Sequence, residues 1–131
     1  TAIDPWPQET FAACLNMHCT GWVIVNAEQQ ITGFILSLIH TKECHILNFA
    51  ILPAYQHQGL GCQLLMHALR EAKEEGAENA YLEVRASNTV AIALYQKARF
   101  FSVGIRKAYY PLIAGKREDA ILLACNLNSE Q

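Results

Sequence analysis

A bend with two glycines, followed at once by an amphipathic helical pattern, is the part of this sequence best suited to hold a charged ligand. The segment AYQHQGLGCQLLMHALREA, residues 54–72, places Gly59 and Gly61 in the bend and has no acidic residue before Glu71. The first N–H groups of a helix lack intrahelical partners, and the helix dipole adds positive potential there. Small residues let this backbone approach an anion closely. The spacing therefore predicts a phosphate-binding site at the start of the helix.

Neither of two common phosphate-binding motifs fits this bend. The chain contains no G-x-x-x-x-G-K-[ST] loop, and the bend lacks the third glycine and the later acidic residue of a dinucleotide-binding fingerprint. The simplest alternative is that Gly59 and Gly61 only permit a tight turn. For an isolated pair of glycines, that alternative is the stronger one.

Three extended segments precede the bend and position it. Apolar patterning predicts strands over residues 21–26, 31–41 and 43–52, which short turns join into an antiparallel meander. A short helix is expected before them, over residues 7–17. The helix that follows the bend is expected to end near Glu75, because Gly76 is suited to a left-handed stop.

The second half of the chain places one more helix among three further strands. These strands are predicted over residues 80–86, 100–107 and 119–127. The helix, over residues 87–98, begins at a cap formed by Ser87 or Asn88. A loop carrying Tyr109 and Tyr110 is expected between the last two strands. Since the long helix crosses from the third strand to the fourth, those two strands form a parallel pair, and the fold class is α+β (mixed α/β).

The composition is that of one globular domain and excludes several classes of protein. Apolar residues make up 52% of the 131 positions, charged residues 17%, and the formal net charge is −2. A single domain over residues 1–131 is large enough to bury a core. There is no basic stripe suited to a nucleic-acid duplex, and the apolar stretches are too short for a membrane span. We expect a monomer that binds neither nucleic acid nor membranes.

The five cysteines are scattered and form no C-x-x-C pair. This usage is typical of reduced thiols in a cytoplasmic protein, where cysteine serves as a small apolar residue. A zinc site built from Cys14, His18, Cys44 and His45 is the alternative, but its spacing matches no common metal-binding pattern. No metal is therefore expected.

Several motifs together resemble one enzyme family. The stretch QHQGLG, residues 56–61, resembles the Q/R-x-x-G-x-G/A loop of the GCN5-related N-acetyltransferases (GNAT). Downstream, LEVRASNTVAIALYQKARF, RKAYYP and GKREDAILLA are similar to the RimI branch, the ribosomal-protein-alanine N-acetyltransferases. The resemblance runs from about Pro5 to the last strand, and these later motifs are more specific than the glycine loop.

The resemblance implies a fold and a cosubstrate. The fold would be a central mixed sheet, with an antiparallel N-terminal meander and a splayed parallel strand pair, flanked by helices. The cosubstrate would be acetyl-coenzyme A, with its pantetheine arm along one strand, its pyrophosphate on the loop, and Asn88 in contact with it. The strand residues would be Phe49, Ala50 and Ile51, and the loop residues His57, Gln58, Gly59, Leu60, Gly61 and Cys62.

Acetyl transfer to an amine needs a base and an acid. An α-amino group, with a pKa near 7.7–8.0, is partly neutral at pH 7, so a weak base is sufficient. The resemblance implies Glu83 as this proton acceptor and Tyr95 as the proton donor to the departing thiolate. The alternatives are that Glu83 is a surface carboxylate paired with Arg85 or a lysine, and that Tyr95 only packs in the core.

The family's acceptor is the N-terminal alanine of a small-subunit ribosomal protein, which would make the partner the N-terminal segment of a substrate protein. Trp6, Tyr109 and Tyr110 would border the slot for this peptide. Two alternatives stay open. One is an acetyltransferase that acts on a lysine or a small-molecule amine, and the other is a coenzyme A-binding module without catalysis.

The sequence departs from the family pattern at three places. The family's strand and part of a helix before Pro5 are expected to be missing. Cys62 stands where relatives often carry arginine, which would weaken phosphate binding. Arg99 replaces the usual glycine at the end of the second helix, and a positive φ there would cost about 1–2 kcal/mol, so we expect the helix to end in another way.

Overall fold

The antiparallel meander forms as the sequence predicts. Strand β2 (Cys19–Val25) pairs with β3 (Ile31–His40), and β3 pairs with β4 (Glu43–Ile51). At the β2–β3 turn, the Asn26 side chain accepts hydrogen bonds from the backbone N–H groups of Glu28 and Gln30 at 3.0 Å. This side chain therefore fixes the turn that sets the register of the meander.

An additional strand lies beside β2. The computed structural model describes residues 2–5, 19–112 and 115–128, and in it β1 (Ala2–Pro5) pairs antiparallel with β2. The edge of the sheet where we expected a strand to be missing is thus occupied by β1. The helix expected over residues 7–17, and Trp6, lie outside the described residues. That residues 1–131 form a single domain stays a prediction.

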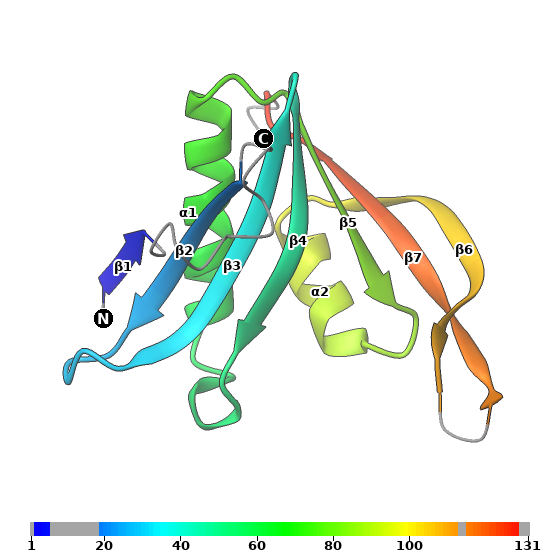
Figure 1. Ribbon diagram of the computed structural model, residues 1–131, viewed down its shortest axis with the longest axis horizontal. Coiled ribbons are helices and arrows are strands. Elements are labelled where there is room, and N and C mark those ends of the chain that lie inside the picture. Colours follow the sequence, from blue (N-terminus) through cyan, green and yellow to red (C-terminus); the bar gives the residue numbers. More distant parts are fainter. Residues whose placement is uncertain (1, 6–18, 113–114, 129–131) are drawn as a thin grey trace.

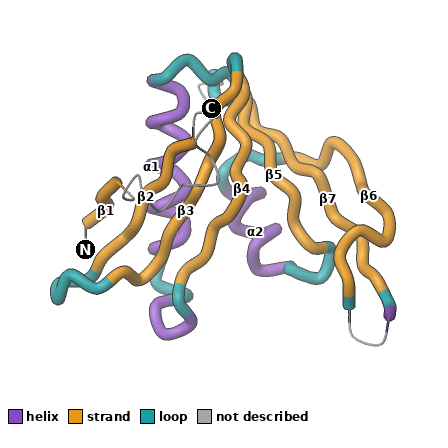
Figure 2. The backbone as a smooth tube through the Cα atoms, in the orientation of Figure 1, coloured by secondary structure: helices purple, strands orange, loops and turns teal. Residues whose placement is uncertain are grey.

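The parallel pair at the centre of the sheet is short and then opens. Strand β5 (Asn79–Arg85) pairs with β4 only from Glu43 to His45, and beyond Tyr81 the two strands diverge (Figure 1). The strands of the whole sheet fan out from one end toward the other (Figure 2). From Ile46 onward, the edge of β4 that faces β5 is therefore free of strand pairing.

Helix α1 (Leu60–Glu74) crosses behind the meander and supplies much of the core. Its buried face consists of Leu64, Leu65, Ala68, Leu69 and Ala72, the spacing of an amphipathic helix. These residues pack with Ile24, Ile35 and Cys44 of the sheet. Gly76, with φ of 101°, follows the end of the helix, which agrees with the predicted stop.

Among the described residues, the remaining elements complete a seven-stranded sheet with the order β1-β2-β3-β4-β5-β7-β6. Helix α2 (Thr89–Lys97) follows β5, and β6 (Phe101–Pro111) pairs antiparallel with β7 (Arg117–Asn126). The placement of Tyr109, Tyr110 and Pro111 in a loop is wrong, because they extend β6. Two shifts of register in β6 hide this strand from a period-two pattern.

The structure gives the oxidation state of four cysteines and the lengths of the described helices. Cys44, Cys62 and Cys125 are free thiols, as expected. Cys19 is disulfide-bonded, so the expectation of reduced thiols throughout is wrong at that position. Among the described residues, none of the helices has the length and apolar character needed to span a membrane.

Candidate active site

A cleft opens where β4 and β5 diverge, and it gathers several of the predicted site residues. This inter-strand cleft, of about 250 Å³, is lined by Phe49 of β4, Glu83 of β5, Asn88 and Tyr95 of the second helix, and Tyr110 of β6. Residues separated by up to 61 positions in the chain thus meet at one place. The splay of the parallel pair creates the cleft, because the edges of β4 and β5 that face each other are not paired beyond His45 and Tyr81.

Glu83 lies on the splayed part of β5, two residues beyond its last pairing with β4. Its side chain is 30% exposed, and its Oε1 accepts a hydrogen bond from Arg106 Nε at 2.9 Å. The alternative partner Arg85 instead contacts Glu118 at 3.3 Å. The cation that pairs with Glu83 is therefore Arg106, and not Arg85 as the alternative proposed. Glu83 lies at the rim of the cleft.

Tyr95 combines core packing with access to the cleft. The residue is only 7% exposed, and its ring contacts Phe49 and Phe100 with centroid distances of 6.2 and 5.7 Å. Burial raises the pKa of the Tyr95 phenol from 10.0 to about 12, with a smaller contribution from Tyr110. The hydroxyl group is thus a neutral hydrogen-bond donor at ordinary pH.

Asn88 caps α2 and also lines the inter-strand cleft. Its Oδ1 accepts a hydrogen bond from Ala91 N–H at 3.2 Å, which selects Asn88 over Ser87 as the cap. At the other end of the helix, Arg99 has φ of 73°, so the expectation that the helix ends in another way is wrong. Arg99 N–H and Phe100 N–H donate to the carbonyls of Gln96 and Tyr95, the two bonds of a Schellman motif.

The glycine loop lies beside the open end of β4. Short helix η2 (Pro53–Tyr55) and the loop lead to Gly59, which caps α1 with φ of 80° and no side-chain hydrogen bond. A Cβ atom on Gly61 would be 3.7 Å from Phe49 Cζ and 3.6 Å from Ile51 Cγ1. The first turn of α1 has no acidic residue. The first N–H groups of α1 are therefore uncapped by side chains, next to the strand segment of residues 49–51.

The predicted loop residues do not themselves line the cleft. His57, Gln58 and Cys62 are exposed at the surface, and His57 has a positive φ of 63°. Ala50 is also exposed, at the end of β4. The structure thus divides the predicted set into a cleft, with Glu83, Asn88 and Tyr95 around it, and an exposed loop adjacent to its strand.

A second depression adjoins the cleft on the side of β6. This β6-side hollow, of about 460 Å³, is lined by His45, Tyr81, Val103, Arg106 and further residues that include Glu83 and Tyr110. Glu83 and Tyr110 also line the inter-strand cleft, so the two depressions meet at these residues. A molecule in each depression would therefore approach the same carboxylate.

Sequence reasoning missed Arg106 and the position of Tyr110. Tyr110 lies with its ring 4.4 Å below the Arg85 guanidinium carbon, which fixes it at the junction of the two depressions. Arg106 reaches Glu83 because β6 shifts its register between Ser102 and Gly104. A bulge leaves no plain pattern in the sequence, so the pairing of Glu83 was not predictable from alternation.

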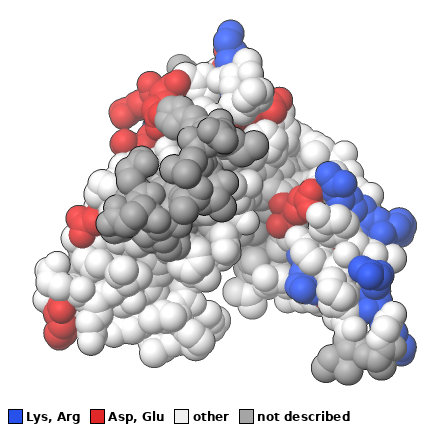
Figure 3. All heavy atoms as spheres, in the orientation of Figure 1, with Lys and Arg blue, Asp and Glu red and all other residues white. Residues whose placement is uncertain are grey.

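Charges are unevenly distributed over the surface. Lys and Arg gather over β6 and β7, and Asp and Glu gather at the C-terminal end of α1 (Figure 3). In the described part of the chain, no group of three or more His, Cys, Asp or Glu residues is arranged to hold a metal ion.

The structure thus combines a splayed parallel strand pair, a glycine loop at the start of a helix and a cleft between the two strands. Residues 2–100 match the Acetyltransferase (GNAT) family, and the chain belongs to this family. The predicted family and enzyme class, an N-acetyltransferase, are confirmed.

Within this family, the chain is similar to N-terminal acetyltransferases of known sequence and structure. The ribosomal protein bS18-alanine N-acetyltransferase of Escherichia coli (strain K12) is 38% identical over 120 residues, which cover 92% of this chain and 80% of the relative. An N-alpha-acetyltransferase of Sulfurisphaera tokodaii is 30% identical over 95% of this chain and 80% of its own length. The crystal structure of the Escherichia coli ribosomal-protein-S18-alanine N-acetyltransferase superposes with a TM-score of 0.82 at 36% identity, covering 98% of this chain and 81% of that one. The predicted fold and the RimI-type homology are thereby confirmed.

Proposed function

We propose that this protein transfers the acetyl group of acetyl-coenzyme A to the N-terminal amine of an alanine at the start of a ribosomal protein. The proposal is supported by the homology to the bS18-alanine enzymes and by the meeting of two depressions at Glu83. One depression would admit the cosubstrate and the other the peptide.

The residues around the cleft suit coenzyme A. The pantetheine arm would pair with the free edge of β4 at Phe49, Ala50 and Ile51, as an added strand does. The pyrophosphate would accept hydrogen bonds from the backbone N–H groups of residues 57–62 at the start of α1. Asn88 would contact the cosubstrate from the second helix.

The transfer of the acetyl group would then need two side chains, one to accept a proton from the amine and one to stabilise the departing thiolate. The amine nitrogen attacks the thioester carbon, the C–N bond forms, and the C–S bond breaks. The departing thiolate would take its proton from the Tyr95 hydroxyl or from water, and the amine proton would leave through Glu83, directly or through water. Because the Tyr95 phenol has a pKa of about 12, its main contribution would be a hydrogen bond to the sulfur as negative charge develops.

An α-amine is the acceptor that this site favours over a lysine side chain. The lysine amine has a pKa near 10.4, two to three units above that of an α-amine. Deprotonating it needs a stronger base, whereas the Glu83 carboxylate is paired with Arg106 at 2.9 Å. A base held by a cation is suited to an amine that is already partly neutral.

Mass spectrometry of a peptide panel tests the proposed function. The protein is incubated with acetyl-coenzyme A and peptides that begin Ala-Arg, Ser or Met, or that have a blocked N-terminus and a free lysine. We expect acetylation of the Ala-Arg peptide at its α-amine, faster than any other. Preferential acetylation of the blocked lysine peptide would instead identify a lysine acetyltransferase, and binding of acetyl-coenzyme A without any transfer would identify a non-catalytic module.

A further inference from the structure

Strand β6 contains a bulge just before Tyr110, which lies at the junction of the two depressions. Arg106 pairs with Ala120 of β7, and Tyr110 pairs with Glu118. Three residues of β6, 107–109, therefore lie opposite the single residue Asp119. A bulge re-aims the side chains that follow it, so this bulge decides where Tyr110 points.

Asp119 holds the bulge together with both of its oxygens. Its Oδ1 accepts a hydrogen bond from Ala108 N–H at 2.9 Å, and its Oδ2 lies 3.4 Å from Lys107 Nζ. Ala108 has φ of 50°, in the left-handed region that alanine rarely adopts. The bond from Ala108 is also the main reason why the pKa of Asp119 lies below its usual value. The carboxylate thus compensates a strained backbone.

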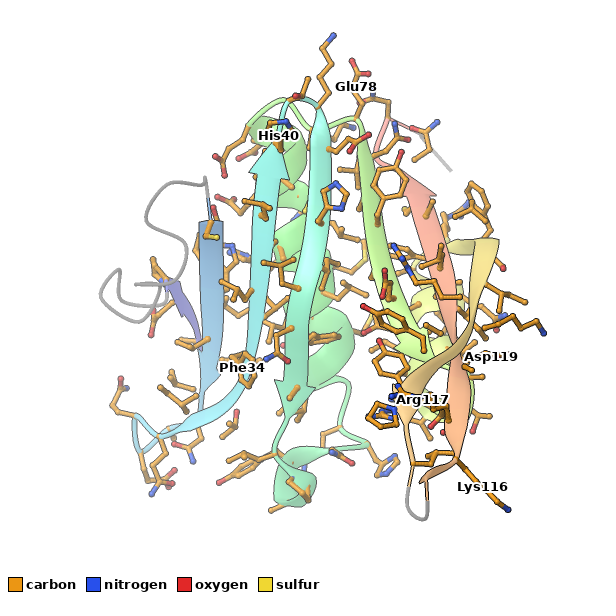
Figure 4. The ribbon with its side chains drawn as sticks, turned by 45° about the vertical axis from the view of Figure 1, so that its right-hand side comes forward. Phe34, His40, Glu78, Lys116, Arg117 and Asp119 are labelled. Carbon is orange, nitrogen blue, oxygen red and sulfur yellow. The ribbon has the colours of Figure 1, made fainter. Side chains whose placement is uncertain are left out.

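Glu118, the preceding residue of β7, links the same segment to the end of β5. Its carboxylate accepts hydrogen bonds from Ser87 N–H at 3.0 Å and from Arg85 Nη1 at 3.3 Å. Arg85 also donates to the carbonyl of Pro111 at 3.4 Å and covers the ring of Tyr110. Figure 4 shows Asp119 on β7 beside β6. Through Arg85 and Ala108, Glu118 and Asp119 therefore hold the segment of β6 that carries Tyr110.

We propose that Asp119 is a positioning residue for the acceptor peptide, which it serves by fixing the bulge that places Tyr110 at the β6-side hollow. The inference rests on the proposed function. Asp119 is not among the residues that line either depression. The segments expected to hold acetyl-coenzyme A belong to β4, the glycine loop and α2, apart from the bulge. Loss of Asp119 therefore affects the peptide more than the cosubstrate, whose cleft the bulged segment meets at Tyr110.

Steady-state kinetics of three variants test this inference on the full chain. With the Ala-Arg peptide as acceptor, Asp119→Ala raises the peptide KM about tenfold, the effect of one lost charge-assisted hydrogen bond. The KM for acetyl-coenzyme A stays within about twofold. Asp119→Asn, which keeps an acceptor for Ala108 N–H, loses less. The double variant D119A/A108G recovers most of the peptide KM, because glycine adopts the left-handed conformation without help.

Three outcomes would overturn the inference. One is a D119A enzyme with an unchanged peptide KM beside an active wild-type enzyme. Another is an equal rise in both KM values together with a fall in Tm, which is the sign of a general loss of structure. The third is failure of A108G to rescue D119A. If the wild-type protein acetylates no α-amine peptide, the proposed function fails, and this inference fails with it, a result distinct from the other three.

Discussion

Glu83 occupies the position from which a base reaches molecules in both depressions, and its carboxylate is already paired with Arg106. This pairing keeps the carboxylate oriented at the junction. In the proposed function, Glu83 would act as the base for the amine. The residue therefore suits a substrate with a low amine pKa.

Glu83→Gln removes the base and keeps the shape of the side chain. We expect kcat to fall about 100-fold, and most at acidic pH, where more of the amine is protonated and needs a base. Affinity for acetyl-coenzyme A, measured by calorimetry, should barely change. Glu78→Gln, at an exposed carboxylate that pairs with Lys42 and lines neither depression, is the matched control and should keep wild-type kcat. Equal activity of Glu83→Gln and the control would contradict the base role.

Tyr95 is the residue for which pH gives the clearest prediction. Its phenol ionises near 10.0 in an unfolded chain and at about 12 in the folded protein, because burial disfavours the anion. As pH rises from about 10 to 12, the unfolded state releases its proton first, so wild-type stability falls by about 3 kcal/mol. Tyr95→Phe lacks this decrease. The buried thiol of Cys44 contributes equally to both proteins, so the difference between them isolates Tyr95.

Urea unfolding at several alkaline pH values measures this difference. The stability of the wild type should decrease more steeply than that of Tyr95→Phe above about pH 10. Parallel curves would mean that the phenol is not held protonated by burial. The same variant should lower kcat at neutral pH, since it removes the donor to the thiolate.

At the scale of elements, the end of α2 positions Tyr95. The Schellman bond from Phe100 N–H to Tyr95 O brings the two rings into contact, and it requires the positive φ of Arg99. Arg99→Gly should therefore stabilise the protein by about 1 kcal/mol and raise Tm in a thermal melt. Ala98→Gly, at a neighbouring position with φ of −84°, should lower Tm instead. A lower Tm for Arg99→Gly would show that the Arg99 side chain supplies more than the strain removes.

The start of α1 offers a test of phosphate binding by gain of charge. Cys62 is an exposed free thiol in the first turn, where a cation would lie beside the expected pyrophosphate. Cys62→Arg should lower the Kd for coenzyme A about threefold at low salt, and the gain should vanish near 1 M salt as charges are screened. Cys62→Met is the uncharged control of similar length. A gain that is equal for arginine and methionine would contradict a phosphate at this helix end.

The elements themselves were largely predictable from the sequence. The meander, the helix after Gly59 and Gly61, and the crossover to β5 follow from apolar period and glycine placement. The extent of β6 was not, because two register shifts break its alternation between Phe101 and Tyr110. The end of α2 was misjudged at Arg99, where the buried Phe100 outweighs local strain.

The sequence was sufficient to predict which residues meet at the site. It was not sufficient to predict which side chains those residues contact. Glu83, Asn88 and Tyr95 meet at one cleft, as the motifs indicate. The pairing of Glu83 with Arg106 depends on the bulged register of a distant strand, and Asp119 acts through a backbone conformation. Contacts of this kind arise from tertiary structure, so spacing along the chain does not encode them visibly.

At the scale of the whole molecule, one deformation of the sheet generates the site. Strands β4 and β5 are paired from Glu43 to His45 and then separate, so a polar strand edge opens next to the glycine loop (Figure 1). The protein carries a net charge of −2, and general attraction for a phosphate ligand is therefore absent. Recognition must come from this local geometry.

A crystal structure of the protein with acetyl-coenzyme A would test most directly whether the cosubstrate binds between β4 and β5. We expect the pantetheine arm between β4 and β5, the pyrophosphate oxygens within hydrogen-bond distance of the amides of residues 57–62, and the thioester beside Tyr95 and Glu83. A cosubstrate bound elsewhere, with the space between the two strands closed, would contradict the account.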